Sequence, residues 1–232
     1  MSLFVLLHGA WHGGWCWRAV QEELRAAGHD SVAPDLPCDD VAAGWSEYAS
    51  SAISAIPTDC DELIVVGHSL AGGLLPIIAT DRPVKRLVLL CSAPPEPRQS
   101  LDDSLAGLSD LTDPRALTFR DTVDSAGRYV WPRLDAATFA MYADCDAESA
   151  RWAYRNLRAQ ATRPFTEPLP VDAWPDVPMT FIVCAEDRMG RAGPLGNLSR
   201  QRFGLEAVVL PGGHSPFLSR PAELTRALLV ER

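Results

Sequence analysis

The chain has 232 residues, of which 47% are hydrophobic and 22% charged, and its formal net charge is −9 at pH 7. This length suits one large domain with a buried core, and the acidic balance argues against a nucleic-acid-binding protein, because phosphate neutralisation requires clustered lysine and arginine. No apolar run approaches the roughly 18–20 residues that span a bilayer, so no membrane partner is expected.

Six short apolar runs predict strands, and most of them lack polar alternation, as expected of strands buried on both faces. They are LFVLL at 3–7, SVA at 31–33, LIVVG at 63–67, RLVLL at 86–90, MTFIVC at 179–184 and AVVL at 207–210. Helices are predicted between and after them, at 17–28, 46–56 with Ser46 as the N-cap, 70–81 and 221–232. Strands that alternate with helices predict an α/β fold with a mostly parallel sheet flanked by helices.

The segment 92–175 interrupts this alternation and is rich in proline, aspartate and arginine. It contains two helix-like stretches, at about 135–142 and 146–160. Long inserts in a compact domain usually act as lids or binding elements. We therefore expect a single domain, in which residues 1–91 and 176–232 form the core and residues 92–175 form a cap.

The N-terminal apolar run has no basic leader and continues into a glycine motif, so it predicts a first strand and not a signal peptide. The six cysteines show neither CxxC nor metal-ligand spacing. In a chain of this size they are expected to be reduced thiols, not a disulfide framework or a zinc site. The sequence thus favours a cytoplasmic protein without a metal.

The stretch VVGHSLAGG at 65–73 places a serine between a predicted strand and a predicted helix. This context is typical of a nucleophile elbow, a tight turn that exposes the serine hydroxyl and needs small neighbours. Gly67 precedes Ser69 by two positions, and Ala71 stands where the usual motif has its second glycine. N–H groups at the start of a helix favour developing negative charge, so Ser69 is the predicted nucleophile.

A serine nucleophile requires a base, and we predict His214 from among five histidines. His214 lies on the glycine-rich loop after the last predicted strand, which can reach the carboxyl edge of the sheet where ligands bind in open α/β folds. His68 is next to the serine, but its side chain is expected to leave the elbow on the wrong side. His8 belongs to the first loop.

The acid that orients the base is expected on the loop after the strand at 179–184, where the sequence reads AEDRMG. We favour Asp187, because its shorter side chain lies further into the loop. Glu186 is the nearer alternative, and Glu96 is a distant one. The chain order of serine, acid and histidine is that of α/β-hydrolases.

The loop HGAWHGG after the first strand predicts an oxyanion hole. In such sites one backbone N–H comes from this loop and another from the residue after the nucleophile, which nominates Ala10 and Leu70. A phosphate-binding loop is disfavoured, because the stretch lacks both the Lys-Ser/Thr of a P-loop and a G-x-G-x-x-G pattern.

These motifs resemble the α/β-hydrolase superfamily, in particular the branch of plant hydroxynitrile lyases, methylesterases of the salicylate-binding type and related bacterial esterases. The resemblance is carried by FVLLHGAWHGGWCWRAVQEELRAAGHDSVAPDLP, by the elbow and by GGHSPFLSRPAELTRALL, and it is weak in the insert. It implies a six-stranded parallel sheet with a helical cap over the site. It carries over Ser69, Asp187 and His214 as the triad, with Ala10 and Leu70 as oxyanion donors.

The resemblance spans two chemistries. In the lyases a threonine stands at the position of Gly9 and a lysine follows the histidine, whereas this chain has Gly9 and Ser215. Cleavage of a small carboxylic ester, thioester or lactone through an acyl-enzyme on Ser69 is therefore favoured over lyase-type carbon–carbon cleavage. A non-catalytic receptor for a small ligand on the same fold remains the alternative from another class.

A substrate pocket rich in aromatic rings is predicted around the site, which suggests a small apolar or aromatic substrate. No cofactor is expected, because side chains and water can perform each step. The oligomeric state does not follow from the sequence, and a homodimer is one of the states left open. The predicted pocket residues are Trp11, His12, Trp131, Phe139, Tyr142 and Phe217.

Overall fold

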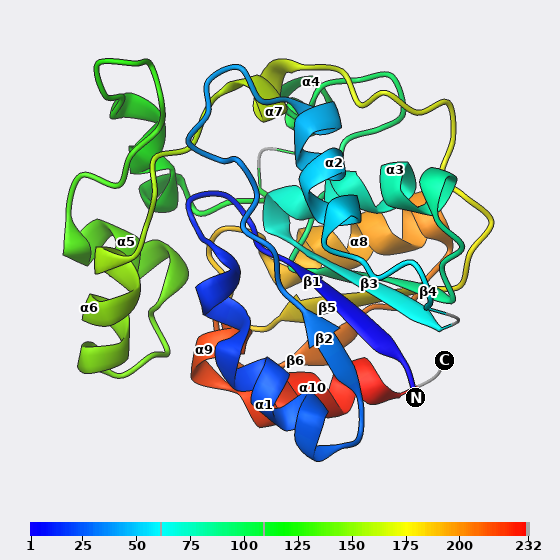
Figure 1. Cartoon of the computed structure of the whole chain (residues 1–232). Coiled ribbons are helices and arrows are strands. Elements are labelled where there is room, and N and C mark those ends of the chain that lie inside the picture. Colours follow the sequence, from blue (N-terminus) through cyan, green and yellow to red (C-terminus); the bar gives the residue numbers. More distant parts are fainter. Residues whose placement is uncertain (61, 109, 231–232) are drawn as a thin grey trace.

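The structure, a computed structural model, describes residues 1–60, 62–108 and 110–230, and for residues 118–121 it describes the backbone alone. Six parallel strands form one sheet in the order β2-β1-β3-β4-β5-β6 (Figure 1). The predicted parallel sheet is confirmed, with each strand within one residue of its expected bounds. The strands are β1 (Leu3–Leu7), β2 (Asp30–Val32), β3 (Leu63–His68), β4 (Arg86–Leu90), β5 (Met179–Cys184) and β6 (Val208–Leu210).

Helices cover both faces of the sheet, which explains why its central strands are apolar on both sides. In β1, Val5 points into one hydrophobic cluster and Phe4 and Leu6 into the other. The first cluster packs under α2 (Trp45–Ser54), α3 (Leu74–Asp81) and α8 (Ala192–Phe203), and the second under α1 (Arg18–Ala26), α9 (Pro216–Ser219) and α10 (Pro221–Leu229) (Figure 1). Among the described residues, no helix combines the length and apolarity needed to cross a membrane.

Some helices begin at residues other than the predicted ones. The Ser46 cap is wrong, because α2 begins at Trp45 with Gly44 as its N-cap. The Glu47 carboxylate accepts a hydrogen bond from the Gly44 N–H at 2.8 Å and so satisfies a backbone donor at that end. Two other predicted helices start with a short 3₁₀ turn, Gly14–Trp17 before α1 and Ser69–Gly73 before α3.

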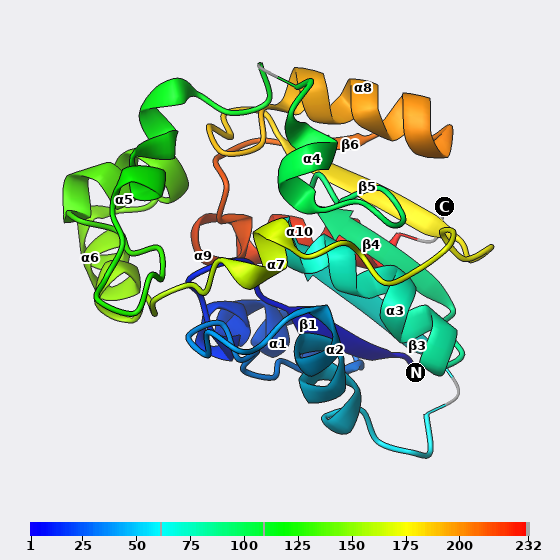
Figure 2. The ribbon, with the colours of Figure 1, turned by 90° about the horizontal axis from the view of Figure 1, so that it is seen from above.

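The insert 92–175 lies near the carboxyl ends of the strands (Figures 1 and 2). Its helices α5 (Leu134–Met141) and α6 (Ala147–Arg155) lie beyond the end of the sheet in both views (Figures 1 and 2). The shorter elements α4 (Leu101–Leu105), the 3₁₀ helix Pro114–Asp121 and α7 (Arg163–Thr166) complete the insert. The predicted helix at 146–160 is shorter than expected and ends at Arg155.

Candidate active site

The predicted nucleophile lies at a sharp turn between β3 and the 3₁₀ helix that leads into α3. Ser69 has a φ of 52°, a left-handed conformation that is rare for a residue with a side chain and is concentrated at functional sites. A Cβ atom at Gly67 would lie 2.2 Å from the Leu75 side chain, so the turn admits only glycine there. The Ser92 hydroxyl donates a hydrogen bond to the Ser69 carbonyl at 2.6 Å. Ser92, which the sequence did not indicate, thus supports the turn.

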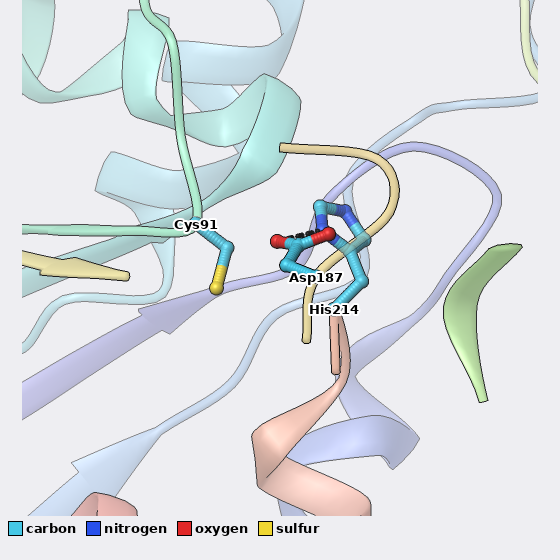
Figure 3. Close-up of side chains that lie close together, drawn as sticks. All are labelled: Cys91, Asp187 and His214. Carbon is cyan, nitrogen blue, oxygen red and sulfur yellow. Dashed lines mark hydrogen bonds and ion pairs between the residues drawn. The ribbon is translucent and has the colours of Figure 1, made fainter. Parts of the chain in front are cut away.

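Asp187 and His214 form a buried hydrogen-bonded pair at the ends of β5 and β6. The His214 Nδ1 lies 2.8 Å from Asp187 Oδ2 (Figure 3). The other carboxylate oxygen, Oδ1, accepts hydrogen bonds from the backbone N–H groups of Met189 and Gly190 at 2.8 and 2.9 Å. Both side chains are almost fully buried. The carboxylate is therefore held by the chain itself and fixes the orientation of the imidazole ring.

The alternative acid, Glu186, is directed elsewhere. Its side chain is exposed and accepts a hydrogen bond from the backbone N–H of Gly212, on the loop that precedes His214. Its own N–H donates to the Gly212 carbonyl at 2.9 Å. Glu186 thus connects two loops, whereas Asp187 contacts the imidazole.

Cys91 adds a thiol to the acid–histidine pair. One ligand-type atom from each of Cys91, Asp187 and His214 lies within 4.8 Å of the other two, and Figure 3 shows the three side chains converging. Hydrogen bonding with the Cys184 thiol and burial raise the pKa of Cys91 well above its usual range. Because a metal site requires a thiolate and here the histidine and carboxylate already bind each other, we interpret the cluster as an acid–base pair beside a neutral thiol.

The predicted oxyanion donors border the same cavity as Ser69 and His214. Ala10 follows β1, and the next residue, Trp11, has a φ of 65°, so strain is stored in this loop as well as in the elbow. Leu70 opens the turn after Ser69. The cavity has a volume of about 90 Å³. Its other described wall residues are Trp11, Cys91, Ala93, Leu101, Leu105, Leu111, Thr112, Leu117, Phe165, Met189 and Gly190.

The wall of this cavity is mainly aliphatic, which differs from the predicted aromatic pocket. Of the six predicted pocket residues, Trp11 alone is among the described wall residues. Leu101 and Leu105 lie in α4. Their spacing by four residues places them on one face of a helix, a pattern that is readable in the sequence. In the same insert, Leu111 comes from an irregular turn and Leu117 from the 3₁₀ helix Pro114–Asp121, and for neither did the sequence offer such a pattern.

The other predicted aromatic residues serve packing or lie on a different surface. Phe139 stacks between the guanidinium groups of Arg115 and Arg188, at 4.5 and 4.2 Å from its ring centre, in a separate surface hollow. Trp131 packs edge-on against Trp11. Phe217, Tyr142 and His12 are buried within the core around the site.

Three histidines near the site are buried and neutral. Burial lowers the pKa of His8 to about 4 and that of His12 to about 3, and it holds the pKa of His68 well below its ordinary value. The His68 ring packs against the His214 ring, with ring centres 4.7 Å apart, and its Nε2 lies 2.9 Å from the backbone carbonyl of His214. The three rings therefore act as fixed neutral groups around the candidate site.

These buried rings predict a loss of stability in mild acid. In the unfolded chain each histidine takes up a proton near pH 6.5, whereas in the folded chain His8, His12 and His68 stay neutral. The unfolded state then binds more protons, so this contribution is complete above pH 6.5 and declines as the pH falls towards the folded-state pKa values. We expect the free energy of unfolding to fall below pH 6 by up to about 1.4 kcal/mol per pH unit for each histidine.

Urea unfolding at pH 7, 6 and 5 measures this slope before most carboxylates titrate. A His68→Gln variant should lose one histidine's share of the slope, while His29→Gln, at a partly exposed site, should keep it. A stability that stays flat between pH 7 and 5 would contradict the neutral assignment of the buried rings.

A family model described as the alpha/beta hydrolase family matches residues 4–227. Norfluorocurarine synthase 2 of Strychnos sp is 28% identical over 97% of this chain and 93% of its own length. Methylesterase 7 of Arabidopsis thaliana is 30% identical over 55% of this chain and 48% of its own length. The crystal structure of a pyrethroid hydrolase from Sphingobium faniae JZ-2 superimposes with a TM-score of 0.84 at 25% identity, over 98% of this chain and 95% of that one.

Proposed function

The chain belongs to the alpha/beta hydrolase family, and we propose that it hydrolyses small carboxylic esters with Ser69 as nucleophile, His214 as base and Asp187 as orienting acid. One observation carries the proposal. The buried Asp187–His214 pair and the strained Ser69 turn meet at one cavity, although they come from three separate loops. The esterases and hydrolases among its relatives support ester cleavage, a carboxylesterase-type activity.

The proposed reaction is acyl transfer in two halves. Asp187 Oδ2 can only accept a hydrogen bond, so the His214 proton resides on Nδ1 and Nε2 is left as the base. His214 removes the Ser69 proton as the hydroxyl attacks the ester carbonyl, and the N–H groups of Ala10 and Leu70 stabilise the resulting oxyanion. The protonated imidazole then gives its proton to the departing alcohol. Water, activated by the same base, releases the acid from Ser69.

The position of Gly9 supports hydrolysis over lyase-type cleavage. A Cβ atom at this position would lie 2.7 Å from His68 Nδ1 and 2.9 Å from Ser69 Cβ, so the threonine of the lyases does not fit beside this elbow. Ser215, at the position of the lyase lysine, is fully buried. Among the cavity's described side chains, neither lysine nor arginine is available to stabilise a cyanide ion.

A Gly9→Ala variant tests this close packing. We expect kcat for ester hydrolysis to fall at least about 100-fold, and the free energy of unfolding to fall by roughly 1–3 kcal/mol, because the added methyl displaces His68 and Ser69. Gly193→Ala, within α8 and with no atom within 4 Å of the new Cβ, is the matched control and should keep wild-type activity. Equal activity in both variants would contradict the tight fit at Gly9.

The cavity supports a small, uncharged substrate. Its volume of about 90 Å³ encloses a small group, and because the cavity is open to solvent the rest of a larger ester can lie outside it. Its wall offers leucine, phenylalanine and methionine side chains, which favour an apolar acyl or alkoxy group. Cytoplasmic residence and a homodimer stay predictions; the six unpaired cysteines support the former, because thiols persist in a reducing compartment.

Turnover of p-nitrophenyl esters from acetyl to octanoyl, with mandelonitrile as a lyase substrate, tests the proposal. We expect the short esters to be cleaved fastest and mandelonitrile to be left intact. Cleavage of mandelonitrile without ester turnover would make the protein a lyase. If neither reacts while a small aromatic compound raises Tm, the receptor alternative replaces the hydrolase.

A further inference from the structure

Both carbonyl groups that flank the proposed oxyanion donor are bound by buried histidines. The Gly9 carbonyl lies 2.9 Å from His8 Nδ1, and the Ala10 carbonyl lies 2.9 Å from His12 Nδ1. In a trans peptide the C=O and N–H point in opposite directions, so fixing the Gly9 carbonyl also aims the Ala10 N–H. Fixing the Ala10 carbonyl sets the next peptide plane. The direction of the Ala10 N–H therefore depends on the His8 ring, and the His12 ring holds the next peptide of the same loop.

Each ring can hold its carbonyl only if Nδ1 carries the proton. For His8 the backbone enforces this tautomer, because the Leu36 N–H donates to His8 Nε2 at 2.9 Å. For His12 the Ala10 carbonyl, which can only accept, already requires the proton on Nδ1, and the Tyr142 hydroxyl 2.9 Å from Nε2 then donates to the ring and anchors it. The anchor of the His12 ring is therefore a side-chain group that a single substitution can remove.

Burial fixes the protonation states of His12 and Tyr142, and these states decide which group donates the hydrogen bond between them. Burial lowers the pKa of His12 to about 3 and raises that of Tyr142, so at neutral pH the imidazole is neutral and the phenol keeps its proton. The phenol must then donate to Nε2, and Nδ1 must donate to the Ala10 carbonyl. In the opposite tautomer, two lone pairs would face each other across 2.9 Å at Ala10.

The same loop is held by the insert at its next residue. The Trp11 N–H donates to the Gln160 side chain at 3.3 Å, and the Trp11 carbonyl accepts from the Arg158 N–H at 2.8 Å. These bonds turn the Trp11 N–H away from the cavity. Tyr142, at the end of α5, is thus one of several insert residues that hold the loop, and it is the one that acts through a titratable ring.

We propose that Tyr142 is a positioning residue for the oxyanion hole, whose hydroxyl anchors the His12 ring against the Ala10 carbonyl and thereby holds the loop that presents the Ala10 N–H. The inference rests on the proposed function, since it assigns a task within that catalytic site. It replaces the predicted role of Tyr142 and His12 as substrate contacts. Its effect should appear when negative charge develops on the carbonyl oxygen, and not when the substrate binds.

The test removes one oxygen atom with Tyr142→Phe and compares an ester with its thiono analogue, in which sulfur replaces the carbonyl oxygen. Sulfur accepts hydrogen bonds weakly, so a damaged oxyanion hole slows the oxygen ester selectively. We expect kcat for the oxygen ester to fall about 10- to 100-fold, KM to change less than about twofold, and the oxygen-to-thiono rate ratio to fall with kcat. Loss of a whole donor costs about 100- to 1000-fold.

Tyr154→Phe is the matched control, because its hydroxyl contacts the Trp131 carbonyl at 3.4 Å within the same insert and does not bind a histidine ring. It should keep both kcat and the rate ratio within about twofold of wild type. Long-range ¹H–¹⁵N spectra of ¹⁵N-histidine-labelled protein, assigned with His12→Gln, report the tautomer directly. The Nδ1–H form of His12 is expected in both proteins, and the Nε2 resonance is expected to shift in Tyr142→Phe because Nε2 loses its hydrogen-bond donor.

The outcomes separate the two proposals. An unchanged His12 Nε2 resonance in Tyr142→Phe, or a kcat and rate ratio within twofold of wild type, overturns the role of Tyr142 alone. An equal loss of rate on both ester types also overturns it, because a packing defect would act in that way. Wild-type protein that leaves the esters intact, or a Ser69→Ala variant that cleaves them at the wild-type rate, overturns the proposed function itself.

Discussion

Ser69→Ala is expected to lower kcat for ester hydrolysis by about 10⁴-fold or more. Without the hydroxyl no acyl-enzyme forms. The remaining reaction is the slow, direct attack of water on the ester, assisted by His214 and the oxyanion donors. Alanine has the same Cβ atom as serine and therefore meets the same steric restriction at a φ of 52°. The variant should fold as the wild type does. The rates are compared in the p-nitrophenyl ester assay.

Labelling with a covalent probe tests the role of Ser69 without a turnover assay. A reactive organophosphonate should add one adduct mass to the wild type and none to Ser69→Ala, as measured by mass spectrometry of the intact protein. Ser54→Ala, an exposed serine on α2, is the control and should retain both the rate and the adduct. Wild-type turnover or labelling in Ser69→Ala would show that another group is the nucleophile.

Asp187→Asn is expected to lower kcat by about 10⁴-fold through the wrong histidine tautomer. The position of Oδ1 receives two backbone N–H groups, from Met189 and Gly190, so the asparagine oxygen must lie there. Its NH₂ group then faces His214, where the wild type has an acceptor. The ring is forced to accept at Nδ1 and to carry its proton on Nε2, which leaves it unable to take the proton of Ser69.

Glu186→Gln is the matched control for this change, because it makes the same replacement at the neighbouring carboxylate. Its side chain binds the Gly212 N–H, which the glutamine oxygen can also accept, so kcat should stay within a few-fold of wild type. The two variants are compared by steady-state kinetics from pH 6 to 9. A larger loss in Glu186→Gln than in Asp187→Asn would transfer the acid role to Glu186.

The sequence predicted the candidate site best where its residues directly follow the ends of strands. The apolar run at 63–67 and the small residues after it fix the elbow locally, because the Gly67 contacts that close the turn come from residues within the same strand–helix unit. Asp187 and His214 each follow a strand of a parallel sheet, so their meeting at one edge follows from topology. These features need only short stretches of sequence and the order of the strands.

The sequence was least informative where the fold brings distant segments together. Phe217 is three residues from His214, yet it lies in α9 and packs on Trp17 on the other face of the sheet. Tyr142 looked like a pocket residue, but its hydroxyl meets a histidine that is 130 positions away. Whether an aromatic side chain enters a cavity or the core depends on such long-range packing, which neither periodicity nor composition encodes.

The two halves of the insert contact different parts of the candidate site. The leucines at 101, 105, 111 and 117 shape the cavity, whereas the segment with Tyr142, Arg158 and Gln160 holds the loop of Ala10. Substitutions at the leucines are expected to alter which esters fit while Ser69, Asp187 and His214 keep their places. A mutant library confined to those four positions would explore substrate range with the catalytic groups intact.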